Sequence, residues 1–268
     1  MRSIGHVESL WRYPVKSMRG QEIPAAFLGF AGVYGDRLYA FHDTAASRGF
    51  PFFTARQQET MLLYAPRFRY PDHAAGPPNL AEAEGIADRL ALSGITPVYA
   101  GAADLMVDVA APSGKVFAID DPALIAALSE GLDRSHTVSL QRSERAATDC
   151  RPVSLCSVQS VQQLAHEVGF ALDKRRFRAN VYVHFDGMAG FAEAALVGRR
   201  LQIGSRAVVA VTDLDPRCKM ITLDPDTAEA RPEVLRRLAQ AHDGKAGLYA
   251  VVLVEGTVRS GDEIRLLD

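Results

Sequence analysis

The apolar residues of this chain gather in short runs separated by turn-forming residues, a pattern typical of β-strands rather than of long helices. Strand-like stretches cover residues 4–13, 38–42, 136–141, 153–156, 181–185, 201–204, 207–211, 248–254 and 256–266. The last two are expected to form a hairpin that closes a small barrel. Many short strands at regular spacing predict a mostly β protein of barrel type with a few helices, in the α+β class.

Helical patterning is confined to three segments, 122–132, 158–168 and 231–242. Asp121 is expected to cap the first helix, with Pro122 in its first turn. Ser157 is expected to cap the second helix and Gly169 to end it. The stretch from about 70 to 104 is rich in Pro, Gly, Ala and acidic residues, and we interpret it as surface loops and short edge strands.

A chain of 268 residues accommodates two ordinary domains. We place their boundary near 115–120, which gives a first domain of residues 1–117 and a second of residues 118–268. The patterning resembles two barrels that share a face more than two independent units. The prediction is an N-terminal β-barrel-like domain packed on a second β-barrel.

Composition and charge exclude several classes of protein. A net charge of −2 gives no general attraction for nucleic acid or membranes, so any anion site must be a local cluster. No apolar run reaches the roughly 18 residues of a membrane span, and the N-terminus lacks a signal-peptide layout. Three cysteines are too few and too odd in number for a disulfide framework. A cytoplasmic location is expected.

Cys218 is the residue around which the candidate chemistry gathers. It follows Pro216 and lies between Arg217 and Lys219, and two cations beside a thiol favour the thiolate, the form that attacks electrophiles and ligates metals. Asp-Pro pairs at 215–216 and 224–225 predict turns on both sides, which places Cys218 on a loop. A lone cysteine is more often a small buried apolar residue, so that alternative stays open.

Short polar loops elsewhere carry cations and hydroxyls that suit an anion. They contain Lys16, Ser17, Arg37, Arg56, Arg178 and Asn180. Each one is most simply a solvated surface residue. Alternation along the segment that leads to Phe185 puts Arg176, Arg178 and Asn180 on one face, however, and two guanidinium groups with an amide form a plausible oxyanion cradle. The sequence lacks the glycine-rich nucleotide loops and the Cys-x-x-Cys or His-x-x-x-His spacing of ordinary zinc sites.

Taken in order, these pieces resemble the MOSC-domain family. The matching motifs are Tyr13-Pro14-Val15-Lys16-Ser17, Gly35-Asp36-Arg37, Thr54-Ala55-Arg56-Gln57, Phe177-Arg178-Ala179-Asn180, Arg217-Cys218 through Asp224-Pro225-Asp226-Thr227, and Gly256-Thr257-Val258 with Gly261-Asp262. The resemblance is greatest to the branch with an added N-terminal barrel, which includes the mitochondrial amidoxime-reducing component and its bacterial counterparts. Two departures are Ala228, where the family has glycine, and Ala179, where proline is common.

The resemblance implies a molybdenum cofactor (molybdopterin) held between the two domains, with Cys218 as the metal ligand and catalytic residue. It implies that a cofactor cradle is formed by Lys16, Ser17, Arg37, Arg56, Ser157, Arg178, Asn180 and Arg217. A soft thiolate suits molybdenum that carries sulfur and oxo ligands, and the pterin phosphate requires Arg, Lys and hydroxyl donors.

The leading hypothesis is an oxidoreductase that reduces N-hydroxylated small molecules. Some bacterial relatives carry a C-terminal ferredoxin-like segment with four cysteines, whereas this chain stops at Asp268, so we expect a separate electron donor: a ferredoxin, a flavodoxin, or a cytochrome b5-like protein with its reductase. The alternative is a carrier of sulfur (as a persulfide) or of the cofactor, acting through Cys218. A third reading is a barrel that binds an anionic small molecule while Cys218 is merely buried.

Overall fold

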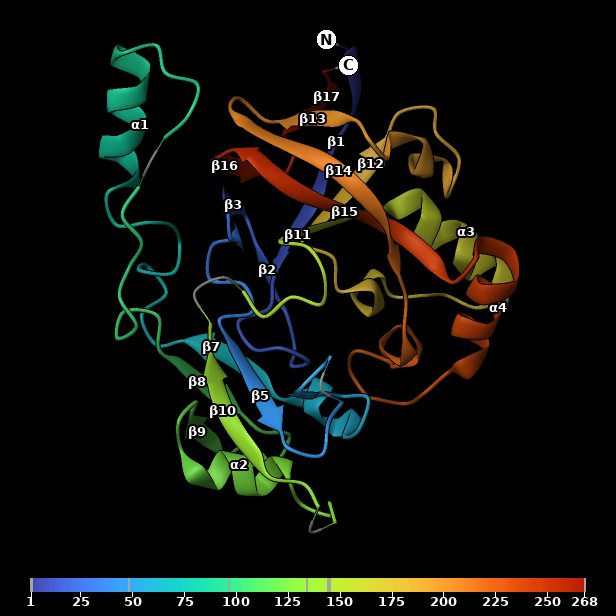
Figure 1. The fold of residues 1–268 in the computed structure, drawn as a ribbon. Coiled ribbons are helices and arrows are strands. Elements are labelled where there is room, and N and C mark those ends of the chain that lie inside the picture. Colours follow the sequence, from blue (N-terminus) through green and yellow to red (C-terminus); the bar gives the residue numbers. More distant parts are fainter. Residues whose placement is uncertain (1, 48, 96, 134, 144–145, 268) are drawn as a thin grey trace.

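The computed structural model describes residues 2–47, 49–95, 97–133, 135–143 and 146–267. Figure 1 shows a barrel with two helices on its outer side, and below it a smaller lobe of short strands. The two chain ends lie close together at the far end of the barrel. The mostly β fold class predicted from the sequence is confirmed.

Seven strands form the closed barrel within the described residues. In ring order they are β12 (Val181–Phe185), β11 (Val153–Ser157), β15 (Lys245–Val254), β14 (Ala207–Pro216), β13 (Arg200–Ile203), β17 (Glu263–Leu266) and β1 (Arg2–Arg12). Pairing of β1 with β12 closes the ring. Neighbouring strands are antiparallel apart from the parallel pair β11 and β12. Apolar side chains from every strand fill the interior, as alternation predicts.

Strand β1 lies at the N-terminus, whereas its two neighbours in the barrel, β12 and β17, come from the second half of the sequence. Val7 is paired with Val183 on one side, and Gly5 is paired with Ile264 on the other. The approach to β12 is close, because a Cβ at Gly5 would lie 2.1 Å from the carbonyl oxygen of His184. Only glycine permits this contact. The barrel is therefore completed by the N-terminal region.

The smaller lobe contains two short sheets and one helix. The sheets are β10 (Val138–Arg142) with β5 (Tyr39–Asp43) and β6 (Phe52–Phe53), and β7 (Ala65–Phe68) with β8 (Val107–Ala110) and β9 (Val116–Ala118). A third short sheet, β16 (Gly256–Arg259) with β3 (Ala25–Gly29) and β4 (Gly32–Val33), lies against the barrel, because Ala26, Leu28, Val33 and Val258 pack in the barrel core. Strand β2 (Gln21–Ile23) extends the barrel sheet beside β1. Helix α2 (Pro122–Leu128) packs into the lobe core through Leu124 and Leu128. Helix α2 follows the predicted domain boundary at residue 117, yet it packs with strands that precede that boundary.

Two helices cover the outer face of the barrel and form a third core with it. Helix α3 (Val158–Val168) begins after Ser157, whose hydroxyl accepts hydrogen bonds from the backbone of Gln159 and Ser160, and it ends at Gly169 with φ of 81°. Helix α4 (Pro232–His242) packs beside it. Both helices were predicted from the sequence, as were the caps Ser157 and Gly169 of helix α3, and the structure has them where expected. Helix α2 also begins at the predicted cap, but it ends at Leu128 rather than near 132.

Two sequence predictions about the fold are wrong. The stretch interpreted as loops contains helix α1 (Leu80–Arg89), which projects from the body beside β16 (Figure 1). It was missed because its strong helix formers surround Gly85 and carry little apolar surface, with only Ala83 and Ala87 buried. The predicted C-terminal hairpin is absent from the described chain: β15 pairs with β11 and β14, whereas β16 pairs with β3 and β17 with β13 and β1.

Four short 3₁₀ helices connect these elements: η1 (Glu59–Leu63), η2 (Lys174–Phe177), η3 (Ala192–Leu196) and η4 (Lys219–Thr222). Helix η2 corrects the alternation assumed for residues 176–180, because the strand begins only at Val181. Within the described chain, we find no helix with the length and apolar character needed to cross a bilayer.

Candidate functional site

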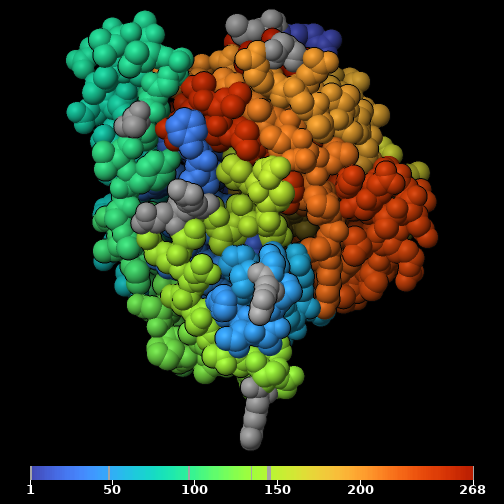
Figure 2. All heavy atoms as spheres, in the orientation of Figure 1, coloured from blue at the N-terminus to red at the C-terminus, as the bar shows by residue number. Residues whose placement is uncertain are grey.

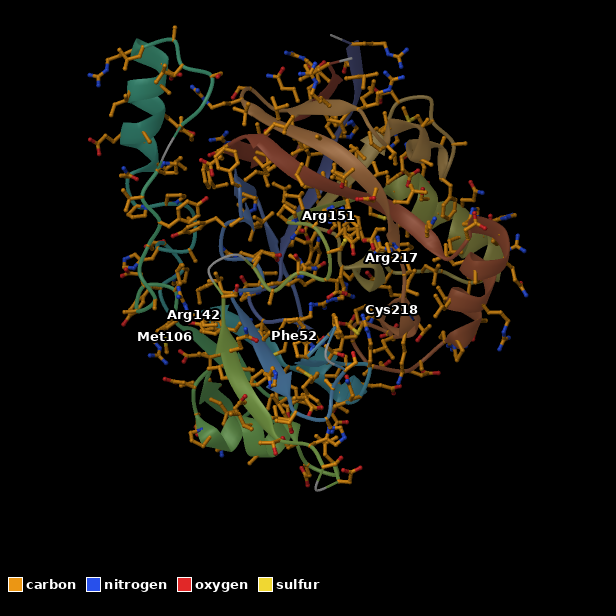
Figure 3. All side chains as sticks on the ribbon, viewed as in Figure 1. Phe52, Met106, Arg142, Arg151, Arg217 and Cys218 are labelled. Carbon is orange, nitrogen blue, oxygen red and sulfur yellow. The ribbon has the colours of Figure 1, made fainter. Side chains whose placement is uncertain are left out.

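A cavity of about 90 Å³ lies where the barrel meets the smaller lobe. Its walls come from loops far apart in the sequence, and Figure 2 shows the stretches near residues 50, 150 and 215 meeting on one face of the molecule. Figure 3 places Arg151, Arg217 and Cys218 in this middle region. Seven cations and two carboxylates belong to the lining residues, in a protein whose net charge is −2. The cavity is thus a local cationic site.

All but one of the residues predicted for the cofactor site line this cavity. They are Lys16, Ser17, Arg37, Arg56, Arg178, Asn180, Arg217 and Cys218. Ser157 is the exception, since it lies outside the cavity lining and its hydroxyl caps helix α3. The sequence motif thus predicted a shared cleft, and the structure brings residues 16, 37, 178 and 218 together.

Three of these residues have an unusual backbone. Ser17, Arg37 and Arg178 have φ of 67°, 46° and 52°, in the left-handed region that non-glycine residues seldom adopt. Such conformations cost free energy and persist where surrounding contacts enforce them, commonly at binding sites. Here each one turns a polar side chain into the cavity rather than along a strand.

Tyr13 holds two of the arginines in place. Its buried ring lies between the guanidinium groups of Arg37 and Arg178, whose carbons are 4.7 and 4.4 Å from the ring centroid. Burial raises the pKa of Tyr13 to about 12, so the ring stays neutral beside both cations. Arg37 also donates from Nη2 to the carbonyl oxygen of Arg178 at 3.0 Å and forms an ion pair with buried Asp36. Stacking and ion pairing thus fix both guanidinium groups.

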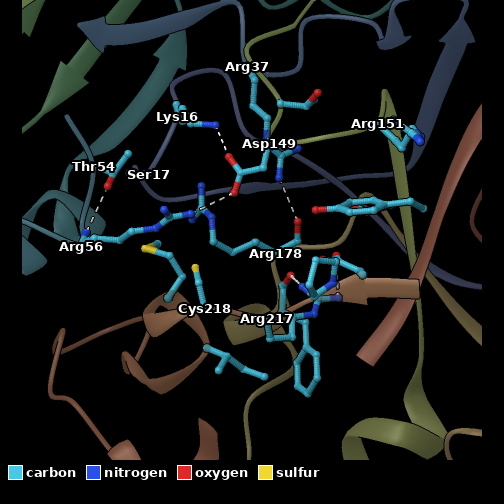
Figure 4. A pocket seen from close by; sticks show the side chains of 18 of the residues that line it. Lys16, Ser17, Arg37, Thr54, Arg56, Asp149, Arg151, Arg178, Arg217 and Cys218 are labelled. Carbon is cyan, nitrogen blue, oxygen red and sulfur yellow. Dashed lines mark hydrogen bonds and ion pairs between the residues drawn. The ribbon is translucent and has the colours of Figure 1, made fainter. Parts of the chain in front are cut away.

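Lys16, Arg56 and Asp149 form a charge cluster in the cavity, and Asp149 lies close to Arg37 (Figure 4). The buried ammonium group of Lys16 donates to Asp149 and, at 2.8 Å, to the carbonyl oxygen of Ala147. Arg56 Nη2 lies 3.6 Å from the same carboxylate. Burial alone would raise the pKa of Asp149, but the charge and hydrogen bond of Lys16 outweigh it and lower that pKa. Asp149 is therefore an ionised group that the sequence did not reveal.

Arg178 retains a donor with no protein partner. Its Nη1 donates to the carbonyl oxygen of Met18 at 2.8 Å, whereas Nη2 is buried and has no hydrogen-bond partner among the described residues. Burial lowers the pKa of Arg178 to about 10. A buried donor without a partner costs free energy, and a bound anion would remove that cost.

Arg217 and Asn180 line the cavity and also contact the protein around it. Arg217 donates to the carbonyl oxygens of Ala246, at 2.7 Å from Nε, and Phe177. Its Nη2 lies 2.9 Å from Asp215 but, like Nη2 of Arg178, has no hydrogen-bond partner among the described residues. Asn180 Oδ1 accepts from the backbone and hydroxyl of Ser154. Asn180 therefore holds the walls together, whereas Arg217 both holds them and keeps a donor for a ligand.

Cys218 lies on the loop between β14 and η4, as predicted, and its side chain faces the cavity (Figure 4). The thiol is half-buried, and it donates no hydrogen bond within the described chain. The two flanking cations that motivated the prediction are turned elsewhere: Arg217 contacts Asp215, and Lys219 donates to the carbonyl oxygen of Arg56 at 3.0 Å and pairs with Glu59 at 2.8 Å. Arg217 still lines the cavity, and the other cations of the lining come from other loops.

Asp215 and Tyr249 are two further lining residues that were not among the predicted site residues. Both are buried, at 5% and 9% exposure, and they are close enough for each to affect the pKa of the other. Burial raises the pKa of Asp215, although Arg217 and Tyr249 act against it. The sequence pattern predicted only a turn at Asp215. The signal that could have identified it as a site residue was its position three residues before Cys218.

The donor set fits a cofactor that combines a soft metal with an anionic group. Cys218 supplies one sulfur ligand, and no cluster of three or more His, Cys, Asp or Glu side chains suited to a metal occurs in the described parts of the chain. One thiolate suits a metal that brings its other ligands with it. Arg178, Lys16, Arg56 and Ser17 surround the space that an anionic group would take.

Residues 142–265 match the family model for the MOSC domain, and residues 4–76 match that for the MOSC N-terminal beta barrel domain. No curated protein matches the sequence. Among solved structures, the YuaD protein from Bacillus subtilis is 17% identical, over 98% of this chain and 96% of that one, with a TM-score of 0.48. YiiM from Geobacillus stearothermophilus is 19% identical over 44% of this chain and 55% of its own, with a TM-score of 0.36. YiiM from Escherichia coli is 16% identical over 47% and 58%, with a TM-score of 0.34. The chain belongs to the MOSC-domain family and carries the family's N-terminal barrel domain in front of its MOSC domain.

Proposed function

We propose that this protein binds a molybdenum cofactor in the cavity between barrel and lobe and reduces N-hydroxylated small molecules. The observation that carries the proposal is the meeting of a thiol, Cys218, with cations from three separate loops in one cavity. MOSC domains are associated with molybdenum-cofactor binding. When bound, the cofactor supplies the redox-active metal, and the protein supplies its binding and orientation.

Different residues of the chain would hold different parts of the cofactor. Cys218 would hold the metal through sulfur. Arg178 would direct its free Nη2 to the anionic end of the cofactor, while Lys16 and Arg56 reach the same region from the lobe. Arg37 and Tyr13 would keep Arg178 in its left-handed conformation. Electrons would come from a separate ferredoxin, flavodoxin or cytochrome b5-like protein.

The test is the metal and pterin content of protein made in a host that synthesises the cofactor. Wild type is expected to retain molybdenum and pterin, and Cys218→Ala to lose molybdenum. Cys150→Ser is the matched control, because Cys150 is an exposed thiol that does not itself line the cavity, although Asp149 and Arg151 beside it do. Equal molybdenum in wild type and Cys218→Ala, or none in wild type, would contradict the proposal.

The same samples distinguish the carrier alternative. A thiol that faces a cavity without a hydrogen-bond partner could also hold a persulfide. Intact mass spectrometry would then find one added sulfur atom on Cys218 in freshly purified wild type, with no turnover of an N-hydroxylated base when a donor system is supplied. Turnover that depends on Cys218 and on molybdenum supports the reductase instead.

A further inference from the structure

The cavity contains two carboxylates in opposite environments. Asp149 is half-exposed and lies among Lys16, Arg56 and other cations, so its pKa is lowered. Asp215 is buried, and burial raises its pKa. When the surroundings of two acids in one site push their proton affinities apart, the one that holds its proton is suited to act as an acid and the other to remain a fixed charge.

We propose that Asp215, beside Tyr249, is the proton donor of this cavity. The inference rests on the proposed reductase function. Reduction of R–NH–OH to R–NH₂ and water breaks the N–O bond and consumes two electrons, from the separate one-electron donor protein, and two protons. One proton goes to nitrogen and the other to the departing oxygen, and Asp215 delivers the proton that lets the oxygen leave as water.

Geometry supports this assignment independently of charge. Asp215 lies at the end of strand β14, next to its last residue, Pro216, and both Asp215 and Cys218 line the cavity. Tyr249, on the adjacent strand β15, also lines the cavity and is close enough to Asp215 to affect its pKa, and Arg217 Nη2 lies 2.9 Å from the Asp215 carboxylate. The contact with Arg217 holds the carboxyl group at the cavity wall, where a proton donor must be held in register with its acceptor.

The groups that surround Asp215 account for its proton affinity. Arg217 and Arg37 favour the carboxylate, as does Tyr249. Burial and the charge of Asp149 oppose ionisation, and Cys156 on strand β11 is a neutral neighbour because burial raises its pKa. Burial is the largest of these effects, so Asp215 holds its proton to higher pH than an ordinary aspartate.

The first experiment compares Asp215→Asn with Asp213→Asn in cofactor-loaded protein. Asp213 lies on the same strand but outside the cavity lining, where it is half-exposed and pairs with Arg151 at 3.0 Å, so its variant is the matched control. Asp215→Asn keeps the shape of the side chain and is expected to retain molybdenum and pterin, with kcat lowered about 100-fold or more and KM little changed. Its rate should also lose the alkaline limb of the pH profile, which Asp213→Asn should keep.

The second experiment uses Tyr249→Phe, which leaves the Asp215–Arg217 pair intact. Removing the hydroxyl removes a group that favours the carboxylate, so Asp215 should keep its proton to higher pH and the alkaline limb should shift upward. A residue that only holds the fold would not shift the profile in this direction. An unchanged pH profile in both variants would overturn the proton-donor assignment while leaving the proposed function in place.

A third measurement needs no activity. In protein made without cofactor, infrared difference spectra between wild type and Asp215→Asn should contain a protonated-carboxyl band that disappears only above the ordinary range for aspartate, whose reference pKa is 3.8. Ionisation within or below that range would overturn the assignment. Absence of molybdenum from wild type would instead reject the proposed function, and the two failures are therefore distinguishable.

Discussion

Gly247 lies beneath the cavity wall and allows the most direct test of how that wall is held. It has φ of 80° on strand β15, and an added Cβ would lie 2.6 Å from the carbonyl oxygen of Leu155 and 2.9 Å from Arg217 Nη2. Leu155 belongs to β11, which pairs with β15 through Leu248. Gly247→Ala is therefore expected both to strain the backbone and to push two barrel strands and Arg217 apart.

The magnitude follows from two separate costs. A left-handed conformation costs an alanine about 1–2 kcal/mol, and forcing extra atoms into a packed site costs a further 1–3 kcal/mol or so, which gives about 2–5 kcal/mol for Gly247→Ala. Gly244→Ala is the matched control, because Gly244 has φ of 71° but nothing within 4 Å of its added Cβ. That variant should lose only about 1–2 kcal/mol.

Urea and thermal unfolding of the cofactor-free proteins would measure the difference, at roughly 2 °C of melting temperature for each kcal/mol in a chain of this size. Equal losses in the two variants would refute the reasoning, because they would mean that β11 and Arg217 yield to the new methyl group without cost.

Two further predictions concern single side chains. Ser157→Ala should cost about 1 kcal/mol of unfolding free energy, because the α3 cap is lost, and should leave molybdenum content at the wild-type level. Loss of the metal with unchanged stability would instead support the cofactor-binding role that the sequence resemblance implies for Ser157. Asp149 has a lowered pKa in the folded protein, so its interaction with Lys16 and Arg56 stabilises the fold above the ordinary aspartate range and is lost as pH falls through the folded value. Unfolding measured from about pH 6 to pH 2 should therefore lose less stability in Asp149→Asn than in wild type, and parallel curves would contradict this.

Sequence patterns identified most strands and the caps of two helices, because these depend on local chemistry. Ser157, Gly169 and Asp121 act within a few residues of their own position, and the structure has them as expected. The order of motifs also predicted which loops meet in one cavity. Ala228 is a different case: alanine in place of the glycine that the resemblance implies put the local turn in doubt, yet Ala228 keeps a left-handed φ of 61°.

What the sequence could not reveal depends on contacts between distant segments. Arg217 and Lys219 flank Cys218 in the chain, yet Asp215 and Glu59 draw them away from it in space. Asp149 gained its role only from the approach of Lys16, which is 133 positions away. The closing of the barrel by β1 and the pairing of β16 with β3 rather than with β15 likewise depend on tertiary contacts, which strand patterning does not determine.

The position of β1 has a consequence for how the protein can be divided. Residues 142–265, expressed alone, would contain β12 and β17 with the edges that β1 covers left bare, and bare edges invite pairing with other chains. Excising the MOSC domain should thus yield an aggregating fragment. Beyond its last residue, Arg12, strand β1 runs directly into the loop that carries Lys16 and Ser17, so the barrel and one part of the cavity wall share one continuous backbone.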